Sequence, residues 1–221
     1  SQSKANADTK VPSQQQLSSL LEHYQNGRLS DAENLAKFIT QQFPQHQFSW
    51  KVLGAIFGRS GRTVEAENAN QTSVALSPQD AEAHSDLGNS LQELGRLDEA
   101  LVSYKQAIAL TPDFEQAHYN LGITLQKMGR LDEAVASYRA AIAVKSDYAE
   151  AHYNLGNTLR DMGKLDEAEA SYNQAIAVKS NFAVAHSNLG MTLQGLGRLN
   201  EAEASFKQAI VLKSDFAEAH N

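Results

Sequence analysis

Histidine, the residue type that most often binds metal, recurs at one phase of the sequence. The five positions, 34 residues apart, are His84, His118, His152, His186 and His220. A metal ion needs imidazole nitrogens that converge to about 2.0–2.1 Å from it. Helices that pack against one another lie about 8–10 Å apart, so equivalent histidines on successive helices form a row and not a cluster. We therefore predict hydrogen bonding at helix junctions for these rings, and no metal site.

Serine, histidine and aspartate occur together in the same intervals, and these are the residue types of a hydrolytic triad. A triad requires one converging set with an oriented base, whereas here the three types are spread evenly along the chain. There is no phosphate-binding loop and no dinucleotide fingerprint. The absence of cysteine excludes thiol chemistry and disulfides. We predict that this chain has no catalytic residues and no cofactor, and is not itself an enzyme.

Asparagine differs, because its positions suit recognition of a peptide. Asn120, Asn154 and Asn188 each precede a Leu-Gly pair, and Asp86 stands at the equivalent place one interval earlier. On a helix, the residue three positions later shares the same stripe, which adds Asn89 and Asn157. A carboxamide both donates and accepts hydrogen bonds, so it can match the backbone of an extended peptide. We predict peptide binding at these six positions. The alternative is that they are tolerated helix-surface residues.

These side chains must be positioned by repeated helix pairs. Leu-Gly recurs every 34 residues, at 53–54, 87–88, 121–122, 155–156 and 189–190. Self-similarity at such a period indicates a stacked repeat architecture. In the reference unit, 81–114, apolar residues at helical spacing predict two helices separated by Gly95. A glycine just past a helix is the usual left-handed terminator. Its equivalents are Gly61, Gly129, Gly163 and Gly197.

The spacing also predicts how helices begin and pack. The pairs Asp113 to Gln116, Asp147 to Glu150 and Asp215 to Glu218 have the spacing of capping boxes. We expect Gly88 to lie opposite Ala100, and Tyr104 to fill the gap between units.

Together these positions resemble the tetratricopeptide repeat (TPR) family. Unit 81–114 carries its pattern as Leu87, Gly88, Leu91, Ala100, Tyr104, Ala107 and Pro112. The resemblance implies an all-α fold: a TPR α-solenoid, a right-handed superhelix of stacked antiparallel helix pairs with a 34-residue period. We divide the chain into a flexible leader (1–12), a divergent unit (13–46), five further units (47–80, 81–114, 115–148, 149–182 and 183–216) and the start of a truncated seventh (217–221).

Departures from the family pattern are informative. Trp50 is replaced by histidine in later units, and the divergent first unit lacks Leu-Gly. In unit 47–80, Asn70 and Ser73 stand where the family has an aromatic residue and alanine. We expect that unit to pack less well on its neighbour.

In the family, the first helices line a concave groove, which implies that the asparagines project into it. The phrases AHYNLG and AHSNLG resemble the superhelical TPR region of O-linked N-acetylglucosamine transferases, which implies backbone binding by Asn120, Asn154 and Asn188. The leading function is a protein-interaction module that binds an extended peptide or a partner helix. One alternative is the substrate-recruiting arm of a larger transferase. Another is a self-associating scaffold, through an apolar face at Leu189, Leu193, Phe206 and Ile210.

Charge and composition narrow the class of partner. The net charge of −7, with scattered Lys and Arg, disfavours nucleic acid. No apolar stretch approaches the roughly 20 residues that cross a bilayer, and the polar start lacks a signal sequence, so we expect a cytoplasmic protein. Lys51 could begin a carboxylate clamp, but Ala55 and Asp86 stand where further donors are needed. Acidic residues prevail on the groove helices, which favours neutral or basic ligands.

Overall fold

The computed structural model describes residues 11–218 of the chain, with side chains described through Lys213. The predicted leader therefore lies mostly outside the described residues, as does His220. Within the described range the secondary structure consists of twelve α-helices and no strand, which confirms the all-α solenoid prediction. The helices are α1 (Gln14–Gln25), α2 (Leu29–Gln42), α3 (Gln47–Arg59), α4 (Thr63–Leu76), α5 (Ala81–Glu93), α6 (Leu97–Leu110), α7 (Glu115–Lys127), α8 (Leu131–Val144), α9 (Ala149–Asp161), α10 (Leu165–Val178), α11 (Ala183–Gly195) and α12 (Leu199–Glu218).

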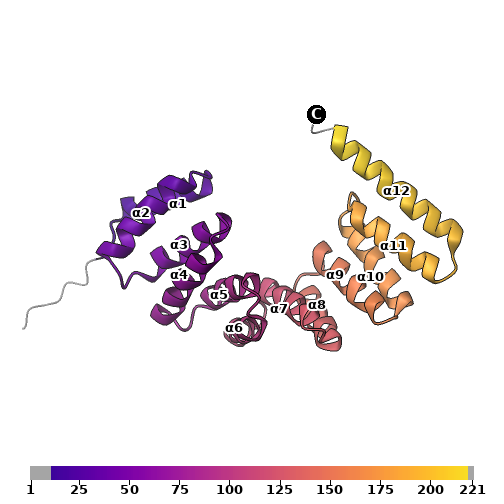
Figure 1. Ribbon diagram of the computed structural model, residues 1–221, viewed down its shortest axis with the longest axis horizontal. Helices are drawn as coiled ribbons and strands as arrows, with labels where there is room; N and C mark the ends of the chain where they lie inside the picture. Colours follow the sequence, from indigo (N-terminus) through magenta and orange to yellow (C-terminus); the bar gives the residue numbers. More distant parts are fainter. Residues whose placement is uncertain (1–10, 219–221) are drawn as a thin grey trace, which may run out of the picture. The chain divides into compact units, whose positions relative to one another are not determined.

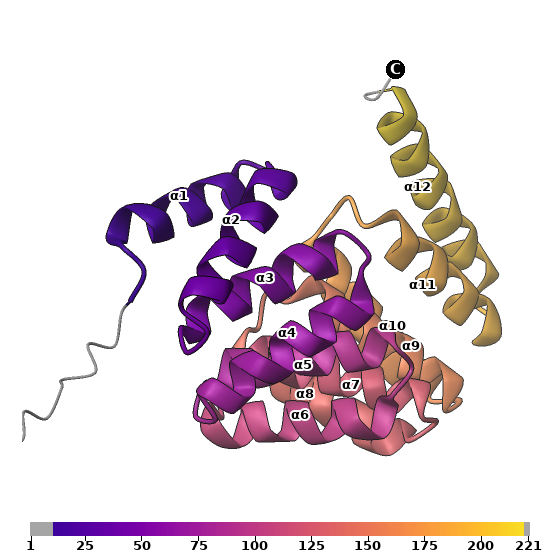
Figure 2. The same cartoon turned by 60° about the vertical axis from the view of Figure 1, so that its left-hand side comes forward.

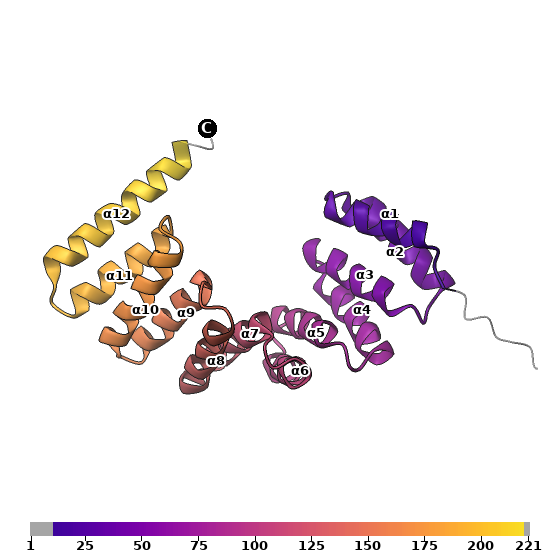
Figure 3. The same ribbon diagram turned by 180° about the vertical axis from the view of Figure 1, so that it is seen from behind.

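The chain divides into two units, residues 1–110 with α1–α6 and residues 111–221 with α7–α12. Within each unit, consecutive helices pack as hairpins (Figure 1). First helices of neighbouring hairpins also touch, α3 with α5 in the first unit, and α9 with both α7 and α11 in the second. Figure 2 shows α3, α4 and α5 stacked, and Figure 3 shows α9, α10 and α11 from behind. Each unit therefore has a surface formed by adjacent first helices.

Glycines in the left-handed backbone conformation end the first helices, as predicted. Gly95 has φ 76°, and its amide and that of Arg96 bond back to the carbonyls of Gln92 and Leu91, at 3.1 and 2.9 Å. This arrangement satisfies carbonyls that the helix end would leave unpaired. The equivalent glycines also have positive φ: Gly27, Gly61, Gly129, Gly163 and Gly197.

In four of the five Leu-Gly pairs, the glycine makes room for an aromatic ring on the second helix of its hairpin. A Cβ added to Gly88 would lie 2.7 Å from Tyr104 Cε1, too close to be accommodated without movement. The same contact recurs between Gly122 and Tyr138 and between Gly156 and Tyr172. The ring therefore packs over the glycine of its own hairpin. The expectations that Ala100 lies opposite Gly88 and that Tyr104 also fills the gap between repeats stay predictions.

The first two hairpins depart from that pairing of small and large residues. At the equivalent positions the first hairpin has Leu20 and Ala36, both fully buried, so the large residue has changed helix. The second hairpin has Gly54 and Asn70, which leaves both positions without a large side chain. As expected from the sequence, packing at this hairpin differs, and a pocket opens there.

Helix capping differs from the prediction. Asp80 caps α5, accepting from the Ala83 amide at 3.1 Å, but the equivalent N-caps of α7 and α9 are Phe114 and Tyr148, which make no side-chain cap. The predicted capping boxes Asp113 to Gln116 and Asp147 to Glu150 were wrong, because each aspartate precedes the actual N-cap by one residue. An aromatic residue has replaced the cap.

The predicted box Asp215 to Glu218 was also wrong, because those residues lie inside α12. The earlier second helices α8 and α10 end at Val144 and Val178, equivalent to Leu212, whereas α12 continues to Glu218. A helix start at Ala217 is therefore not seen.

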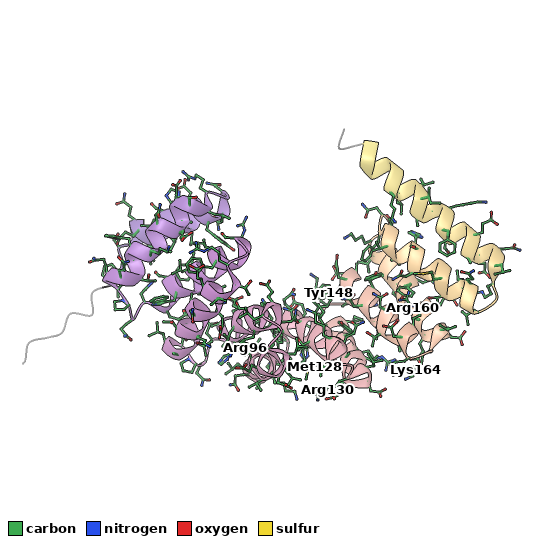
Figure 4. All side chains as sticks on the ribbon, in the orientation of Figure 1. Arg96, Met128, Arg130, Tyr148, Arg160 and Lys164 are labelled. Carbon is green, nitrogen blue, oxygen red and sulfur yellow. The ribbon has the colours of Figure 1, made fainter. Side chains whose placement is uncertain are left out.

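Arginines at three of the turns, Arg62, Arg96 and Arg198, link their hairpin to the one before. Arg96, which is labelled in Figure 4, contacts Glu99 of its own hairpin and Glu67 of α4, both at 2.6 Å. Arg198 pairs in the same way with Glu201 and Glu169, at 2.6 Å each. Hydrogen bonds from Arg198 hold the pKa of Glu201 below its usual value.

Among the described helices, none is long and apolar enough to span a bilayer.

Candidate functional site

The histidines bind the helix junctions, as predicted. The Nε2 atom of His118 lies 2.8 Å from the Pro112 carbonyl oxygen, and that of His152 lies 3.0 Å from the carbonyl of Ser146. Trp50 makes the same contact, its Nε1 donating to the Pro44 carbonyl at 2.9 Å. Histidine therefore replaces tryptophan without losing this bond. The described residues contain no group of three His, Cys, Asp or Glu side chains that could hold a metal ion.

Two of the predicted peptide-binding asparagines are oriented by tyrosines one repeat earlier. In residues 111–221, Asn154 Nδ2 donates to the Tyr119 hydroxyl and Asn188 Nδ2 to the Tyr153 hydroxyl, both at 3.0 Å. Asn188 Nδ2 also donates to Asn157 Oδ1 at 2.7 Å. Both asparagines are half-buried. In these side-chain hydrogen bonds, Asn154 and Asn188 act as donors through their Nδ2 groups.

Asn120 lies deeper than the other two. Only 8% of it is exposed, and its Oδ1 accepts from Gln116 Nε2 at 3.0 Å. Gln116 Oε1 in turn accepts from the hydroxyl of Tyr148 at 2.9 Å; Figure 4 labels Tyr148. On α7 the exposed amide is therefore that of Gln116, whereas Asn120 is buried and bonded to it.

Aromatic contacts set the tyrosines in place, and the sequence reasoning missed them. The ring centroids of Tyr119 and Tyr148 are 4.8 Å apart, and those of Tyr153 and Phe182 are 5.1 Å apart. The residues that replaced the helix caps therefore pack on these rings. Burial raises the pKa of Tyr119, and it raises that of Tyr148 to about 12, so both hydroxyls stay protonated near neutral pH. The sequence did contain a signal for these contacts, since the phrase AHYNLG places Tyr119 and Tyr153 directly before Asn120 and Asn154.

Asn89 and Asn157 each accept a hydrogen bond from the tyrosine of their own hairpin. Asn89 Oδ1 accepts from the Tyr104 hydroxyl at 2.8 Å, and Asn157 Oδ1 accepts from that of Tyr172 at 2.7 Å. Burial raises the pKa of Tyr172 to about 12, which keeps it a donor. These two asparagines therefore satisfy buried phenols at the surface made by the first helices.

Asp86, the acidic member of the row, lines a pocket of about 170 Å³ within residues 1–110. The pocket lies among α3, α4 and α5, which are stacked in Figure 2. Burial raises the pKa of Asp86 to about 6, with Glu82 and Asp80 adding to the effect and Lys51 opposing it. The lining residues are Gly54, Ala55, Gly58, Asn70, Asp86, Asn89, Ser90 and Glu93.

Lys51 is held away from any clamp role by two carboxylates. Its Nζ pairs with Glu82 and lies 3.3 Å from Asp80 Oδ2. Burial lowers the pKa of Lys51, but these two ion pairs outweigh it and leave the pKa above its ordinary value. Its charge is therefore already compensated by these two carboxylates. The lack of a carboxylate clamp stays a prediction.

Family models for tetratricopeptide repeats match three stretches of the chain, residues 88–129, 113–181 and 183–213. Together these stretches cover more than half of the 221 residues. The chain belongs to the tetratricopeptide repeat family. The narrower resemblance to O-linked N-acetylglucosamine transferases stays a prediction, and among curated proteins none matches this TPR chain significantly.

Solved TPR structures are similar to this chain over most of its length. MamA is 27% identical with a TM-score of 0.71, covering 75% of this chain and 97% of its own. YrrB, described as a TPR protein with an unusual peptide-binding site, is 19% identical with a TM-score of 0.66, covering 81% and 93%. A thermophilic TPR protein of Thermus thermophilus is 24% identical with a TM-score of 0.65, covering 82% and 98%. The last two likenesses establish the fold alone.

An apolar surface on α12 is the remaining candidate for contact with a partner. Leu199 and Ile210 are 63% and 64% exposed, beside a depression of about 320 Å³ that Phe206 also lines. Leu189 and Leu193, which we expected on an open apolar face, are buried. The exposed apolar surface of this last hairpin therefore lies on its second helix, α12, and not on its first helix, α11.

Proposed function

We propose that this protein is an interaction module that binds an extended peptide along its first helices and does no chemistry on it. TPR proteins bind proteins or peptides, and one similar structure is described as having a peptide-binding site. The proposal concerns the surface formed by α7, α9 and α11, where the predicted asparagines lie.

The observation that carries the proposal is the orientation of Asn154 and Asn188. Their Nδ2 groups donate to Tyr119 and Tyr153, so each amide is held in one orientation. Within the described chain, the Oδ1 atoms take no part in these bonds. A fixed acceptor on each of two adjacent first helices suits the backbone N–H groups of an extended ligand. Because such acceptors read main chain, the proposal implies broad selectivity for ligand sequence.

The test is the affinity of capped, unstructured synthetic peptides of neutral and of basic composition. In the triple variant Asn120→Ala, Asn154→Ala, Asn188→Ala, we expect affinity to fall about tenfold or more, since several hydrogen bonds are lost. Asn173→Ala is the matched control, because Asn173 is an exposed asparagine on the second helix α10. Equal affinity of the triple variant and the control would remove the assignment of these asparagines.

Self-association is a second candidate, favoured by the exposed Leu199 and Ile210. We expect molar mass in light scattering to rise with protein concentration, and Ile210→Lys to suppress that rise by placing a charge on the apolar surface. A monomer mass at every concentration would exclude this candidate.

A further inference from the structure

The pocket beside Asp86 has a buried acceptor at its floor. Asn70 is 3% exposed, and its Nδ2 donates to the Asp86 carbonyl at 3.1 Å and to Ser90 Oγ at 2.9 Å. A carbonyl can only accept, so this bond fixes which end of the amide faces α5. Asn70 Oδ1 has no hydrogen-bond partner, and it points at Gly54, where an added Cβ would lie 2.0 Å from it. A buried acceptor without a donor is unfavourable, which points to a ligand that donates.

The walls add further oxygen atoms and negative charge. The half-buried Asp86 carboxylate forms one wall, and the exposed Glu93 stands at the rim, where its Oε2 accepts from Thr63 Oγ1 at 3.2 Å. Lys51, the nearby cation, is engaged by Asp80 and Glu82. The pocket therefore presents two carboxylates and one buried amide oxygen, with no compensating positive charge among its lining residues.

The shape of the pocket admits a side chain end-on. Its α3 wall consists of Gly54, Ala55 and Gly58, which have little or no side chain. Gly54, Asn70 and Ser90 are buried, whereas Gly58 and Glu93 are exposed, so depth increases from the rim to Asn70. A volume of about 170 Å³ is several times the space of one water molecule, about 30 Å³.

We propose that this pocket binds the guanidinium group of an arginine side chain carried by the peptide ligand. A guanidinium presents five N–H donors in a plane, enough to bond Asp86, Glu93 and Asn70 Oδ1 together, and it stays charged at any physiological pH. The site deepens the proposed function and rests on it, because it assigns one anchoring residue to the bound segment. It lies within residues 1–110, apart from the asparagines that test the proposed function.

The probe is the capped peptide acetyl-Gly-Gly-Arg-Gly-Gly-amide, followed by NMR shifts of the Asn70 side-chain amide and of the α5 backbone. The matched probe replaces arginine by citrulline, which has nearly the same shape and no charge. We expect saturable shifts with arginine and about tenfold weaker binding of citrulline, since hydrogen bonds to charged groups are the stronger ones. In Asp86→Asn we expect the arginine peptide to bind about tenfold more weakly. This variant should fold, because three later units carry asparagine at the equivalent position.

Three results would overturn the site. These are equal binding of the two peptides, unchanged binding in Asp86→Asn, or no shift of Asn70 at saturating arginine peptide. A fourth is the same pattern of shifts from magnesium or calcium chloride alone, with exclusion of the peptide, which would make the pocket a cation site. The triple asparagine variant leaves every pocket residue intact, so failure of the proposed function and failure of this site give different results.

Discussion

The pocket within residues 1–110 and the equivalent place within residues 111–221 show two outcomes of one backbone pattern. Gly54, Asn70 and Asp86 correspond to Gly156, Tyr172 and Asn188. In the second set, Tyr172 is fully buried over Gly156 and donates to Asn157 Oδ1, to which Asn188 also donates. In the first set, Asn70 is too short to fill the space, and Asp86 has no proton to donate when ionised.

The difference teaches that one glycine can serve two purposes. In the repeats with tyrosine, the missing Cβ gives space to a ring and stabilises the hairpin. In the hairpin with Asn70, the same missing Cβ leaves a pocket of about 170 Å³ with polar walls. Stability and a binding cavity therefore compete for the same position in a repeat.

The largest effect is expected for Tyr172→Asn, which places asparagine beside Gly156, as Asn70 lies beside Gly54. Tyr172 is 0% exposed, so the loss of its ring should lower the free energy of unfolding by about 3–5 kcal/mol. Urea denaturation followed by circular dichroism measures this loss. Asn173→Asp, on the exposed side of the same helix, serves as the control and should change stability by less than about 0.5 kcal/mol. A loss below about 1 kcal/mol would contradict the filling role of Tyr172.

Gly156→Ala should come next. The added Cβ would lie 2.7 Å from Tyr172 Cε1, so the ring must move, at a cost of about 1–3 kcal/mol. Gly58→Ala is the control, because nothing lies within 4 Å of its Cβ, and alanine should there stabilise α3 by about 0.5–1 kcal/mol. The same urea experiment compares the two variants. Similar stability changes in both would show that close packing on glycine is not the cause.

Asp86→Asn should stabilise the protein near neutral pH by about 1–2 kcal/mol, because it removes a charge that burial disfavours. The pKa of Asp86 is raised from 3.8 to about 6, so the folded state binds this proton more tightly than the unfolded state. In the wild type the contribution of Asp86 to unfolding free energy is therefore least above about pH 6 and grows as pH falls toward about 4.

Unfolding measured for both proteins across this range provides the check. The advantage of Asp86→Asn should shrink as the wild-type carboxyl takes up its proton. Lys51, Asp80 and Glu82, whose charges act on Asp86, are present in both proteins and serve as the common background. A stability difference that does not vary with pH would be inconsistent with a buried, ionised Asp86.

The smallest effect is expected for Asn70→Tyr, which places a ring beside Gly54, as Tyr172 lies over Gly156. The ring would fill the pocket, but the bonds from Asn70 to the Asp86 carbonyl and Ser90 are lost. We expect a net gain of about 0.5–1 kcal/mol from the added apolar burial, measured by urea denaturation. The arginine peptide should no longer shift the α5 backbone. Retained peptide binding in a stabilised variant would place that binding outside the pocket.

Much of the fold could be predicted because it depends on local patterns. The turn glycines and the histidine junction bonds follow from residues close together in the sequence, as the six-residue step from Pro112 to His118 illustrates. The caps could not be predicted in this way. Asp113 has the spacing of a capping residue, but the helix begins one residue later, where Phe114 is the N-cap.

The candidate site was predicted only in part. The row of asparagines was visible in the sequence, but their partners were not, since Asn154 and Asn188 bond to tyrosines 35 residues earlier. The pocket had a sequence signal in Asn70, which stands where the family has an aromatic residue. Its consequence depends on Gly54 and Asp86, each 16 residues away on a different helix.

The sequence by itself determined the repeat, the helix pairs, the left-handed turns and the family, because all of these follow from apolar spacing and glycine placement along the chain. Only the tertiary structure decided which polar groups are already bonded, where a void opens and which carboxylate is buried. The physical reason is that volume and hydrogen bonds are shared between neighbouring helices. Whether Asn70 and Asp86 line a pocket, and Tyr172 and Asn188 a filled core, depends on what packs beside them.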